Sequence, residues 1–583
     1  MQKIIDLLYL KLHQALMAAF PELPPDTLLE IVQSKQEKFG HYQFNSPMKL
    51  GKILGLPPKE IALKVVNNLK DNALPFSVEI AGPGFINISI ASAFLASYVN
   101  QMLKDQKLGV DVQQANKRII IDFSSPNTAK EMHVGHLRSS IIGDCLARLF
   151  EFLGYDVLRL NHIGDWGTAF GMLIAYMKEH CKKVLLGEET TDLSHLMAWY
   201  KSSKAQFDAD ESFKKRAQQE VVLLQNHAPE SMKAWHIICD ISKKAYQEIY
   251  DILGIKLIER GESFYNPMLK DTVDDLQKKN MITLSDGAKC VFLEGFQNRE
   301  GQALPLMVQK SDGGYNYDTT DMAAIRHRVQ SERGDRIIYV TDAGQATHFK
   351  MIFQAAEKAG YLNLDPHKKA RVDHVPFGLV LGPDGKKFKT RSGETEKLID
   401  LITTAIEKAD AILTERASEM SEKERKELAK ALGIGAIKYA DLCSNRLSDY
   451  AFSYDRMLRF EGNTAAFIMY SYVRVQGIKR KAHADVETLI ATKSIDLQHP
   501  SEIRLAMHLA QFSETLGTLA ESLFPNLLTD YLFGLAEKFN AFFRDCRVEG
   551  ANEEGSRLLL AEVTARVLKQ GLEILGLQVV DKM

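Results

Sequence analysis

Residues 117–144 read KRIIIDFSSPNTAKEMHVGHLRSSIIGD, which combines a strand pattern, a turn and the start of a helix. Within this stretch, residues 119–121 are isoleucines, a β-branched run that is typical of a strand buried on both faces in a parallel sheet. Residues 124–127 end the run, and a helical pattern opens near Gly135. A second strand pattern, YDVLRLNHIGD, follows at 155–165. A strand, a helix and a second strand within about 40 residues predict a βαβ unit.

The sequence after this unit continues the alternation with one interruption. Strand patterns return at 289–295, 335–342 and 374–382, whereas the segment at about 175–265 is helical and charged. We therefore expect an α/β fold whose main part, residues 116–395, is a Rossmann-like parallel-sheet domain that carries this segment as a helical insertion.

Two further domains are expected at the ends of the chain. Apolar residues recur every fourth position from Ile4 to Leu16, as on one face of an amphipathic helix, and 78–90 alternates like a pair of strands. Residues 1–115 therefore predict a small α+β N-terminal domain. From about residue 396 the strand patterns stop and helical patterns run on, so residues 396–583 predict an all-α C-terminal domain.

Composition narrows the class of protein. The 583 residues include 73 Lys and Arg against 75 Asp and Glu, a net charge of −2, which excludes a uniformly basic nucleic-acid coat but not one basic face. The 6 cysteines are scattered without a CxxC pair, which argues against a disulfide framework or a zinc ribbon. No apolar run approaches the length of a membrane span, and the N-terminus lacks a signal-peptide pattern. We expect a cytoplasmic protein without a membrane segment.

The strongest chemical signal is His133-Val134-Gly135-His136, which follows the buried strand and enters a helix. The free N–H groups and positive dipole at a helix N-terminus suit a nucleotide polyphosphate. Gly135 lacks a side chain where an adenine could pack on the backbone. Histidines at i and i+3 can both donate hydrogen bonds to phosphate oxygens. These bonds would stabilise the negative charge that shifts among the oxygens during attack on the α-phosphate. The motif therefore predicts a nucleotide site.

A second signal is the basic segment GKKFKTRSG at 385–393, which follows the strand pattern ending near Leu381. Its lysines and arginine could clamp a triphosphate or pyrophosphate. Alone, such a segment is more often a solvated basic loop. Together with the histidine motif it favours a phosphate clamp.

These two elements resemble the signatures of class I aminoacyl-tRNA synthetases. HVGH resembles the HIGH motif, and 387–391 stands where the KMSKS loop would stand. The stretches 123–144, 161–174, 311–324 and 460–478 resemble the arginyl-tRNA synthetases in particular, and the resemblance covers nearly the whole chain.

The resemblance implies an activity and its partners. It implies ATP-dependent ligation of L-arginine to tRNA(Arg) through an arginyl-adenylate intermediate, with ATP as a substrate and Mg²⁺ accompanying it, although no metal-ligand cluster appears in the sequence. It also implies a catalytic role for the parallel-sheet domain and a requirement for bound tRNA before the adenylate forms. We expect a monomer.

The resemblance assigns roles residue by residue. The catalytic set that it implies is Lys130, His133, Gly135, His136, Lys387 and Lys389. The implied ATP-binding residues are Lys130, His133, Gly135, His136 and Lys387. The implied arginine-binding residues are Asp122, Ser125, Asn127, His136, Tyr317, Asp321 and Gln345. Thr390 occupies the position of the second KMSKS lysine, and the resemblance implies that Lys130 stands in for it.

The chemistry of arginine supports the pocket assignment. A guanidinium is always charged and presents a rigid fork of donors, so a selective pocket needs a carboxylate. Tyr317 and Asp321 are four residues apart and would share one face of a helix. Without the motifs, a helix-start aspartate and a packed tyrosine would be the simpler interpretation.

The expected tRNA contacts are less specific. Residues 441–482 carry more basic than acidic side chains, together with tyrosines that could stack on unpaired bases: Tyr450, Tyr454, Tyr470 and Tyr472. An ordinary helical bundle would show the same composition. The resemblance implies that the C-terminal domain binds the anticodon arm and the N-terminal domain the tRNA elbow, where Tyr42, Gln43 and 85–87 are candidate surface contacts.

Three alternatives remain at this point. A class I ligase for another amino acid would not need Asp321 opposite a guanidinium. A simpler nucleotidylyltransferase would not need the long helical C-terminal domain. A catalytically silent tRNA-binding relative would have no reason to keep His133, Gly135, His136 and Lys130 together.

Overall fold

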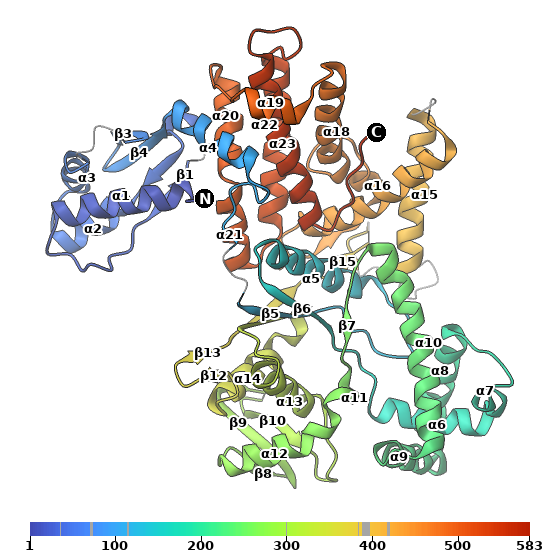
Figure 1. Cartoon of the computed structure of the whole chain (residues 1–583). Helices are drawn as coiled ribbons and strands as arrows, with labels where there is room; N and C mark the ends of the chain where they lie inside the picture. The colour runs from blue at the N-terminus through green and yellow to red at the C-terminus, as the bar shows by residue number, and fades with distance from the viewer. Residues whose placement is uncertain are drawn as a thin grey trace.

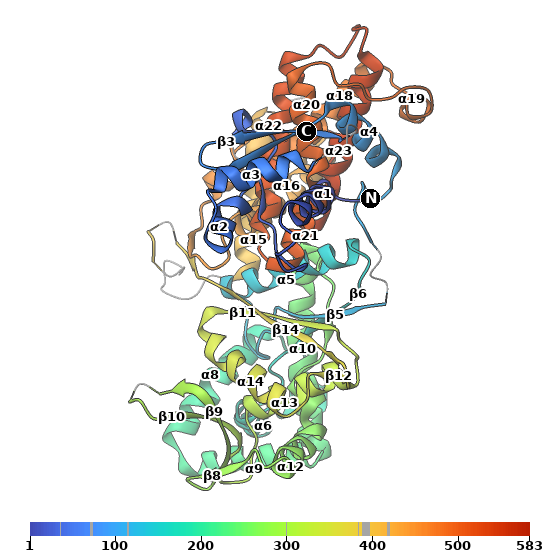
Figure 2. The same cartoon turned by 90° about the vertical axis from the view of Figure 1, so that its left-hand side faces the viewer.

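A computed structural model describes residues 1–34, 36–69, 74–112, 116–298, 300–382, 384–386, 397–416 and 420–583. A small blue N-terminal part and a large orange-red helical part lie above a central sheet, and two further lobes lie below it (Figure 1). Figure 2 shows the same arrangement from the side, with the helical part and the lower lobes at opposite ends. The residues at which these parts divide, about 115 and 395, stay predictions.

The central sheet has five parallel strands in the order β14-β11-β5-β6-β7. Its strands are β5 (Arg118–Asp122), β6 (Asp156–Asn161), β7 (Ile258–Glu259), β11 (Arg336–Asp342) and β14 (Arg371–Phe377). Ile119 and Ile121 pack in one core with α5 (Val134–Phe152), and Ile120 packs in a second core with α13 (Tyr317–Gln330) and α14 (Ala346–Lys358). Both faces of β5 are therefore covered, which confirms the predicted Rossmann-like α/β class.

Helices interrupt the sheet between β6 and β7. They are α6 (Thr168–His180), α7 (Lys182–Leu186), α8 (Leu193–Ala209), α9 (Glu211–Gln225) and α10 (Pro229–Leu253). After β7 the chain forms α11 (Glu262–Tyr265), α12 (Leu269–Lys278) and an antiparallel sheet of β8 (Thr283–Ser285), β9 (Ala288–Gln297) and β10 (Ala303–Gln309). The strand pattern at 289–295 thus belongs to this separate sheet. Short turns join β9 to β8 before it and to β10 after it, and a short turn can connect only antiparallel strands. β9 therefore pairs with these two strands and not with the parallel sheet. A small hairpin, β12 (Asn363–Asp365) and β13 (Lys368–Lys369), follows α14.

The N-terminal part is an α+β unit with the sheet order β1-β2-β4-β3. Its strands are β1 (Ile31–Gln33), β2 (Tyr42–Phe44), β3 (Phe76–Ala81) and β4 (Phe85–Ile90), with α1 (Ile4–Ala19), α2 (Ser46–Leu54), α3 (Pro58–Asn67) and α4 (Ser92–Lys104). Tyr42 is fully buried and donates a hydrogen bond of 2.7 Å to Glu514 of the C-terminal part. The expectation that Tyr42 is a surface contact for tRNA is therefore wrong, since its hydroxyl joins two parts of the chain.

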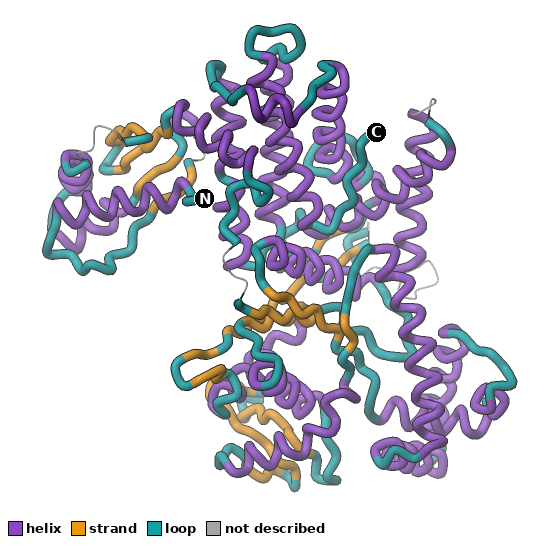
Figure 3. Tube along the Cα trace, in the orientation of Figure 1, coloured by secondary structure: helices purple, strands orange, loops and turns teal. Residues whose placement is uncertain are grey.

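The C-terminal part is almost wholly helical, as the purple tubes of Figure 3 show. Its helices are α15 (Leu398–Arg416), α16 (Glu422–Leu442), α17 (Tyr454–Met457), α18 (Ala465–Lys481), α19 (Val486–Thr492), α20 (Pro500–Ala510), α21 (Phe512–Ser522), α22 (Asn526–Asp545) and α23 (Glu554–Ile574). One short strand, β16 (Tyr450–Ala451), pairs in parallel with β15 (Val380–Leu381). None of the helices in the described ranges is long and apolar enough to cross a membrane.

The tyrosines expected to stack on tRNA bases differ in exposure. Tyr470 is 40% exposed on α18, beside the Arg474 guanidinium at 5.0 Å, whereas Tyr472 is only 7% exposed. Tyr472 packs in the core of the bundle, so the expectation that it stacks on a base is wrong.

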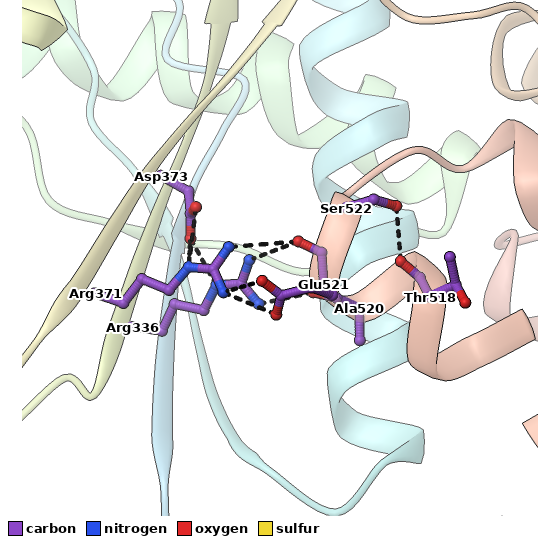
Figure 4. Close-up of polar contacts among 7 residues, drawn as sticks. All are labelled: Arg336, Arg371, Asp373, Thr518, Ala520, Glu521 and Ser522. Carbon is purple, nitrogen blue, oxygen red and sulfur yellow. Dashed lines mark hydrogen bonds and ion pairs between the residues drawn. The ribbon is translucent and has the colours of Figure 1, made fainter. Parts of the chain in front are cut away.

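Two arginines attach the parallel sheet to the end of α21 (Figure 4). Arg336 of β11 donates to Asp373 at 2.6 Å and to the Ala520 carbonyl at 2.7 Å. Arg371 of β14 donates to both oxygens of Glu521, at 2.7 and 2.8 Å. Because a helix C-terminus presents unpaired carbonyls and negative partial charge, cationic side chains are favourable there.

These two contacts should differ in their contribution to stability. Arg336 is 11% exposed, whereas Arg371 and Glu521 are 44% and 73% exposed. We expect Arg336→Ala to lower the free energy of unfolding by about 2–3 kcal/mol, because buried partners lose their donors. Arg371→Ala should cost about 1 kcal/mol or less, since exposed ion pairs are screened. Thermal unfolding of both variants checks this, and an equal loss in the two would contradict it.

Candidate active site

A cavity of about 400 Å³ opens at the carboxyl ends of β5, β11 and β14. The sheet order reverses between β5 and β11, since the chain continues to β6 on one side and returns to β11 and β14 on the other. Ligands of open α/β sheets bind at such a switch point. The residues that line the cavity are Ser124, Ser125, Asn127, His133, Val134, Gly135, His136, Arg138, Ser139, Val340, Thr341, Asp342, Gln345 and 377–380.

The two histidines of the HVGH motif form a reciprocal cap at the start of α5. The His133 Nδ1 accepts the Gly135 N–H at 3.0 Å, and the His136 Nδ1 accepts the His133 N–H at 3.1 Å. The two ring centroids are 4.1 Å apart. A neutral ring whose Nδ1 accepts must carry its proton on Nε2. In its neutral form, His136 therefore offers an Nε2–H donor besides its capping contact.

The electrostatic surroundings keep His136 neutral. Burial lowers the pKa of His136 to about 3, and the neighbouring His133 ring and Lys130 act in the same direction. Gly135 leaves room for the His133 ring over the first turn of α5, because a Cβ at this position would lie 2.8 Å from the His133 Cε1. The motif thus holds the uncharged His136 ring beside the His133 ring at the N-terminus of a helix that faces the cavity.

The turn after β5 positions Ser125 beside the cavity. Ser124 and Ser125 adopt positive φ angles of 74° and 49°, an uncommon conformation for residues other than glycine. The Asn161 side chain stabilises the turn by accepting the Ser125 N–H at 2.9 Å. The Ser125 hydroxyl donates to Asp122 at 3.0 Å.

Asp122 lies outside the cavity lining. Its carboxylate is buried and pairs with the Arg328 guanidinium at 2.8 Å. Asp122 therefore orients Ser125 and balances the charge of a buried arginine. Asn127 lines the cavity, and its backbone carbonyl accepts from the Tyr246 hydroxyl of the insertion at 2.6 Å.

Tyr317 and Asp321 lie together on the first turns of α13, as their spacing predicts. Tyr317 is 61% exposed, and its ring centroid lies 4.9 Å from that of His348. Asp321 lies 2.6 Å from the His348 Nε2. Burial acts to raise the pKa of Asp321, but the hydrogen bond from His348 and nearby positive charges lower it. Gln345 lines the cavity and donates to Asp342 at 3.1 Å, three residues before His348.

The predicted lysines lie at the edge of the site or beyond the described residues. Lys130 is exposed, and its ammonium lies 5.4 Å from the centroid of the Tyr200 ring of α8. Lys387 and Lys389 fall outside the described residues. The flanks of the basic segment lie beside the site, since Val380 lines the cavity and Lys397 forms a bridge with His133.

Several residues that line the cavity were not predicted from the sequence. Thr341, Asp342 and 377–380 line the cavity at the ends of β11 and β14. The ends of the strand patterns at 335–342 and 374–382 could have indicated them, because ligand-binding residues follow parallel strands. Arg138 also lines the cavity while it donates to the Gly378 carbonyl at 2.9 Å.

Additional titratable groups surround Asp321. Burial and the charges of Asp165 and Asp321 raise the pKa of Glu262 to about 7. Burial acts to lower the pKa of His348, but hydrogen bonds to Asp318 and Asp321 raise it to about 9. No pattern of residue types in the sequence points to Glu262 or His348. Within the described ranges, no group of three or more His, Cys, Asp or Glu residues could hold a metal ion.

Family descriptions match most of the chain. The "tRNA synthetases class I (R), catalytic domain" matches residues 98–454, and the "DALR anticodon binding domain" matches residues 468–583. The "Arginyl tRNA synthetase N terminal domain" matches residues 7–90.

Proteins with similar sequences and structures are arginine–tRNA ligases, also called arginyl-tRNA synthetases. The chain is 62% identical to an arginine–tRNA ligase of Protochlamydia amoebophila over 100% of both chains, and 51% identical to that of Chlamydia felis over 98% of both. The crystal structure of arginyl-tRNA synthetase from Plasmodium falciparum superposes with a TM-score of 0.87 at 34% identity, over 100% of both chains. The chain belongs to the arginyl-tRNA synthetases, a family of class I aminoacyl-tRNA synthetases.

Proposed function

We propose that this protein is an arginine–tRNA ligase, which activates L-arginine with ATP and transfers it to tRNA(Arg). The observation that carries the proposal is the placement of the paired His133 and His136 rings, with His136 neutral, beside a cavity at the switch point of the sheet. Membership of the arginyl-tRNA synthetase family supports it along the whole chain. A catalytically silent relative is disfavoured, because the capped histidine pair is intact.

In the first step the arginine carboxylate attacks the α-phosphorus of ATP. A new P–O bond gives arginyl-adenylate, and the bond to the β-phosphate breaks to release pyrophosphate. We propose that the Nε2–H groups of His133 and His136 donate to the phosphate oxygens as charge develops on them. Lys130, Lys387 and Lys389 would supply positive charge for the triphosphate. The protein forms no covalent intermediate and acts by positioning and electrostatic stabilisation.

Arginine would lie between the turn after β5 and the start of α13. Ser125 and Asn127 would hold its main-chain groups, with His136 at the border to ATP. Asp321 would pair with the guanidinium, and Tyr317 and Gln345 would complete the pocket. Asp122 would act from behind by orienting Ser125. A neutral analogue such as citrulline would leave the Asp321 carboxylate unpaired, which a buried site penalises heavily.

In the second step a hydroxyl of the 3′-terminal ribose of tRNA attacks the carbonyl carbon of the adenylate, and AMP leaves. We propose that the C-terminal helices bind the anticodon arm, with Tyr470 and Phe543 as exposed aromatic contacts. We also propose that tRNA must be bound before the adenylate forms.

Aminoacyl-tRNA synthetases use ATP as a substrate, and we propose that Mg²⁺ enters with it. Mg²⁺ that enters with a nucleotide is typically held by the substrate phosphates and takes few ligands from the protein. This is compatible with the lack of a metal-binding cluster among the described residues. When bound it would neutralise phosphate charge. We further propose a monomer that works in the cytoplasm, where the free thiols found at all 6 cysteines are stable.

Charging of tRNA with labelled amino acids tests the proposed function. The purified protein should esterify arginine to tRNA(Arg), with lysine and citrulline as poor substrates. Rapid charging with a different amino acid would replace the proposal by a class I ligase of other specificity.

The pKa of Glu262 predicts how arginine affinity depends on pH. Because burial and neighbouring carboxylates raise this pKa to about 7, the Glu262 carboxylate takes up a proton as the pH falls from 8 to 6. The pocket then loses negative charge, so KM for arginine should rise by about threefold to tenfold, the effect of roughly 1 kcal/mol. Glu262→Gln should have a high KM at both pH values.

The matched control is Glu211→Gln, because Glu211 is 79% exposed on a helix of the insertion. This variant should keep the pH dependence of the wild type. A wild-type KM that does not change between pH 6 and pH 8 would contradict the prediction.

A further inference from the structure

His348 lies between two carboxylates on the neighbouring helix. Its Nε2 is 2.6 Å from an Asp321 oxygen, and its Nδ1 is 3.2 Å from an Asp318 oxygen. The three side chains are between 10% and 20% exposed, so water screens these contacts only weakly. A neutral imidazole has one N–H and can donate to only one carboxylate. Two simultaneous hydrogen bonds require the imidazolium form.

The contacts leave one oxygen of Asp321 for a ligand. Among the hydrogen bonds of the described residues, the Asp321 carboxylate accepts one, from His348 at Oδ2. Asp318 is held from the other side, because its Oδ2 accepts the Met307 N–H of β10 at 3.1 Å. His348 therefore connects a carboxylate that is anchored to a strand with one that keeps a free oxygen. The Tyr317 ring packs against the same imidazole at 4.9 Å between centroids.

The charges of this cluster suit one cationic side chain. Asp318 and Asp321 contribute two negative charges and His348 one positive charge, which leaves one negative charge for a guanidinium. The raised pKa of His348, about 9, agrees with this count. The titratable and charged groups that face the cluster are Tyr317, Asp318, Asp321 and Arg328 on α13, His374 on β14, Tyr339 on β11, Cys290 on β9, Glu262 on α11, and His162 after β6. Arg328 is already paired with Asp122.

We propose that His348 is a positioning residue for arginine specificity: it holds Asp321 so that the free oxygen meets the guanidinium, and it offsets the charge of Asp318. The inference rests on the proposed function, since it assigns a role toward that substrate. His348 itself would not touch the reacting atoms. It would act through Asp321 on the affinity for arginine and on the preference for arginine over lysine.

Two neutral variants separate the roles of the ring nitrogens. The amide nitrogen of glutamine can take the place of Nε2 and reach Asp321, whereas that of asparagine takes the place of Nδ1 and reaches Asp318. His348→Asn should raise KM for arginine by about tenfold to a hundredfold, the worth of one hydrogen bond to a charged group. It should change kcat little and increase the relative use of lysine. His348→Gln should rescue KM to within about fivefold of the wild type, because a neutral donor is weaker than a charged one.

The pH dependence of KM for arginine distinguishes the proposed role from a merely structural one, because a structural role would not change it. Above pH 9 the wild type loses the imidazolium, so its KM should rise more steeply from pH 8 to pH 10 than that of His348→Gln. Comparing the two enzymes cancels the titration of the arginine amino group. NMR of the protein labelled at histidine Cε1, with His348 assigned from the His348→Gln spectrum, should show a titration above pH 8.

Each outcome decides for or against the inference. Equal KM values for the asparagine and glutamine variants, or a neutral His348 at pH 7.5, would overturn it while the wild type still charges arginine. A wild type that does not charge arginine would overturn the proposed function, and the role of His348 with it. Thermal unfolding of both variants shows whether either substitution acts by lowering stability. In that case the asparagine and glutamine variants would show similar changes in kcat and in KM, which would also overturn the inference.

Discussion

Asp321→Asn should lower kcat/KM for arginine by about a thousandfold, the largest effect that we expect from a single substitution. The guanidinium of arginine stays charged at all working pH values, so its site must supply negative charge. Truncating one partner of a buried, hydrogen-bonded charge pair costs about 2–5 kcal/mol, mostly because the other charge is left unpaired. Charging assays at several arginine concentrations measure the effect.

Asp318→Asn is the matched control for this change. Both aspartates contact His348 and both lie on α13, so either change removes one carboxylate from the same imidazole. Only Asp321 is proposed to pair with the substrate, so Asp318→Asn should lower kcat/KM by about tenfold or less, as for the loss of one hydrogen bond. Equal losses in the two variants would show that the ion pair with His348, and not contact with arginine, explains the effect.

His136→Ala should lower kcat for adenylate formation by about a hundredfold to a thousandfold, the loss that removal of one preorganised oxyanion donor causes in acyl-transfer enzymes. The alanine removes an Nε2–H donor that faces the cavity, and it also removes the acceptor for the His133 N–H. Single-turnover formation of adenylate measures the chemical step directly. His195→Ala is the control, since His195 is 61% exposed and pairs with Asp192 on the insertion.

The pH profile distinguishes a neutral donor from a charged one. Because burial lowers the pKa of His136 to about 3, this ring is uncharged throughout the range from pH 5 to pH 9. Lowering the pH to 5.5 should therefore reveal no acidic limb that belongs to His136. An acidic limb near pH 6.5 that disappears in His136→Ala would contradict the proposed role.

The fold was largely predictable because its central signals are local. Three consecutive isoleucines require cover on both sides of a strand, and the structure places them between two cores. The HVGH motif lies at a helix start because a strand, a turn and a helical pattern surround it in the sequence. The strand pattern at 289–295 was ambiguous, because an apolar run does not say which neighbour it pairs with. The short connections around β9 decide in favour of an antiparallel sheet.

Apart from the histidine motif and the basic segment, the candidate site was predictable only where the resemblance supplied the residues. No local sequence pattern predicts that Arg328 pairs with Asp122, or that His348 lies between two carboxylates, because these contacts join residues that are far apart in the chain. Burial of Tyr42 was also hidden, because its partner Glu514 lies in a different part of the chain. Tyrosine serves equally well as a surface contact and as a buried donor, and only tertiary packing decides between these roles.

The exchange of labelled pyrophosphate into ATP tests the central claim most directly, because it reports formation of the adenylate at the cavity. The purified protein should catalyse exchange with arginine when tRNA(Arg) is present, and not with lysine, glutamine or cysteine. Exchange that depends on another amino acid would contradict the pocket of Tyr317, Asp321 and Gln345. No exchange with any amino acid, while tRNA still binds, would contradict the catalytic assignment of His133 and His136.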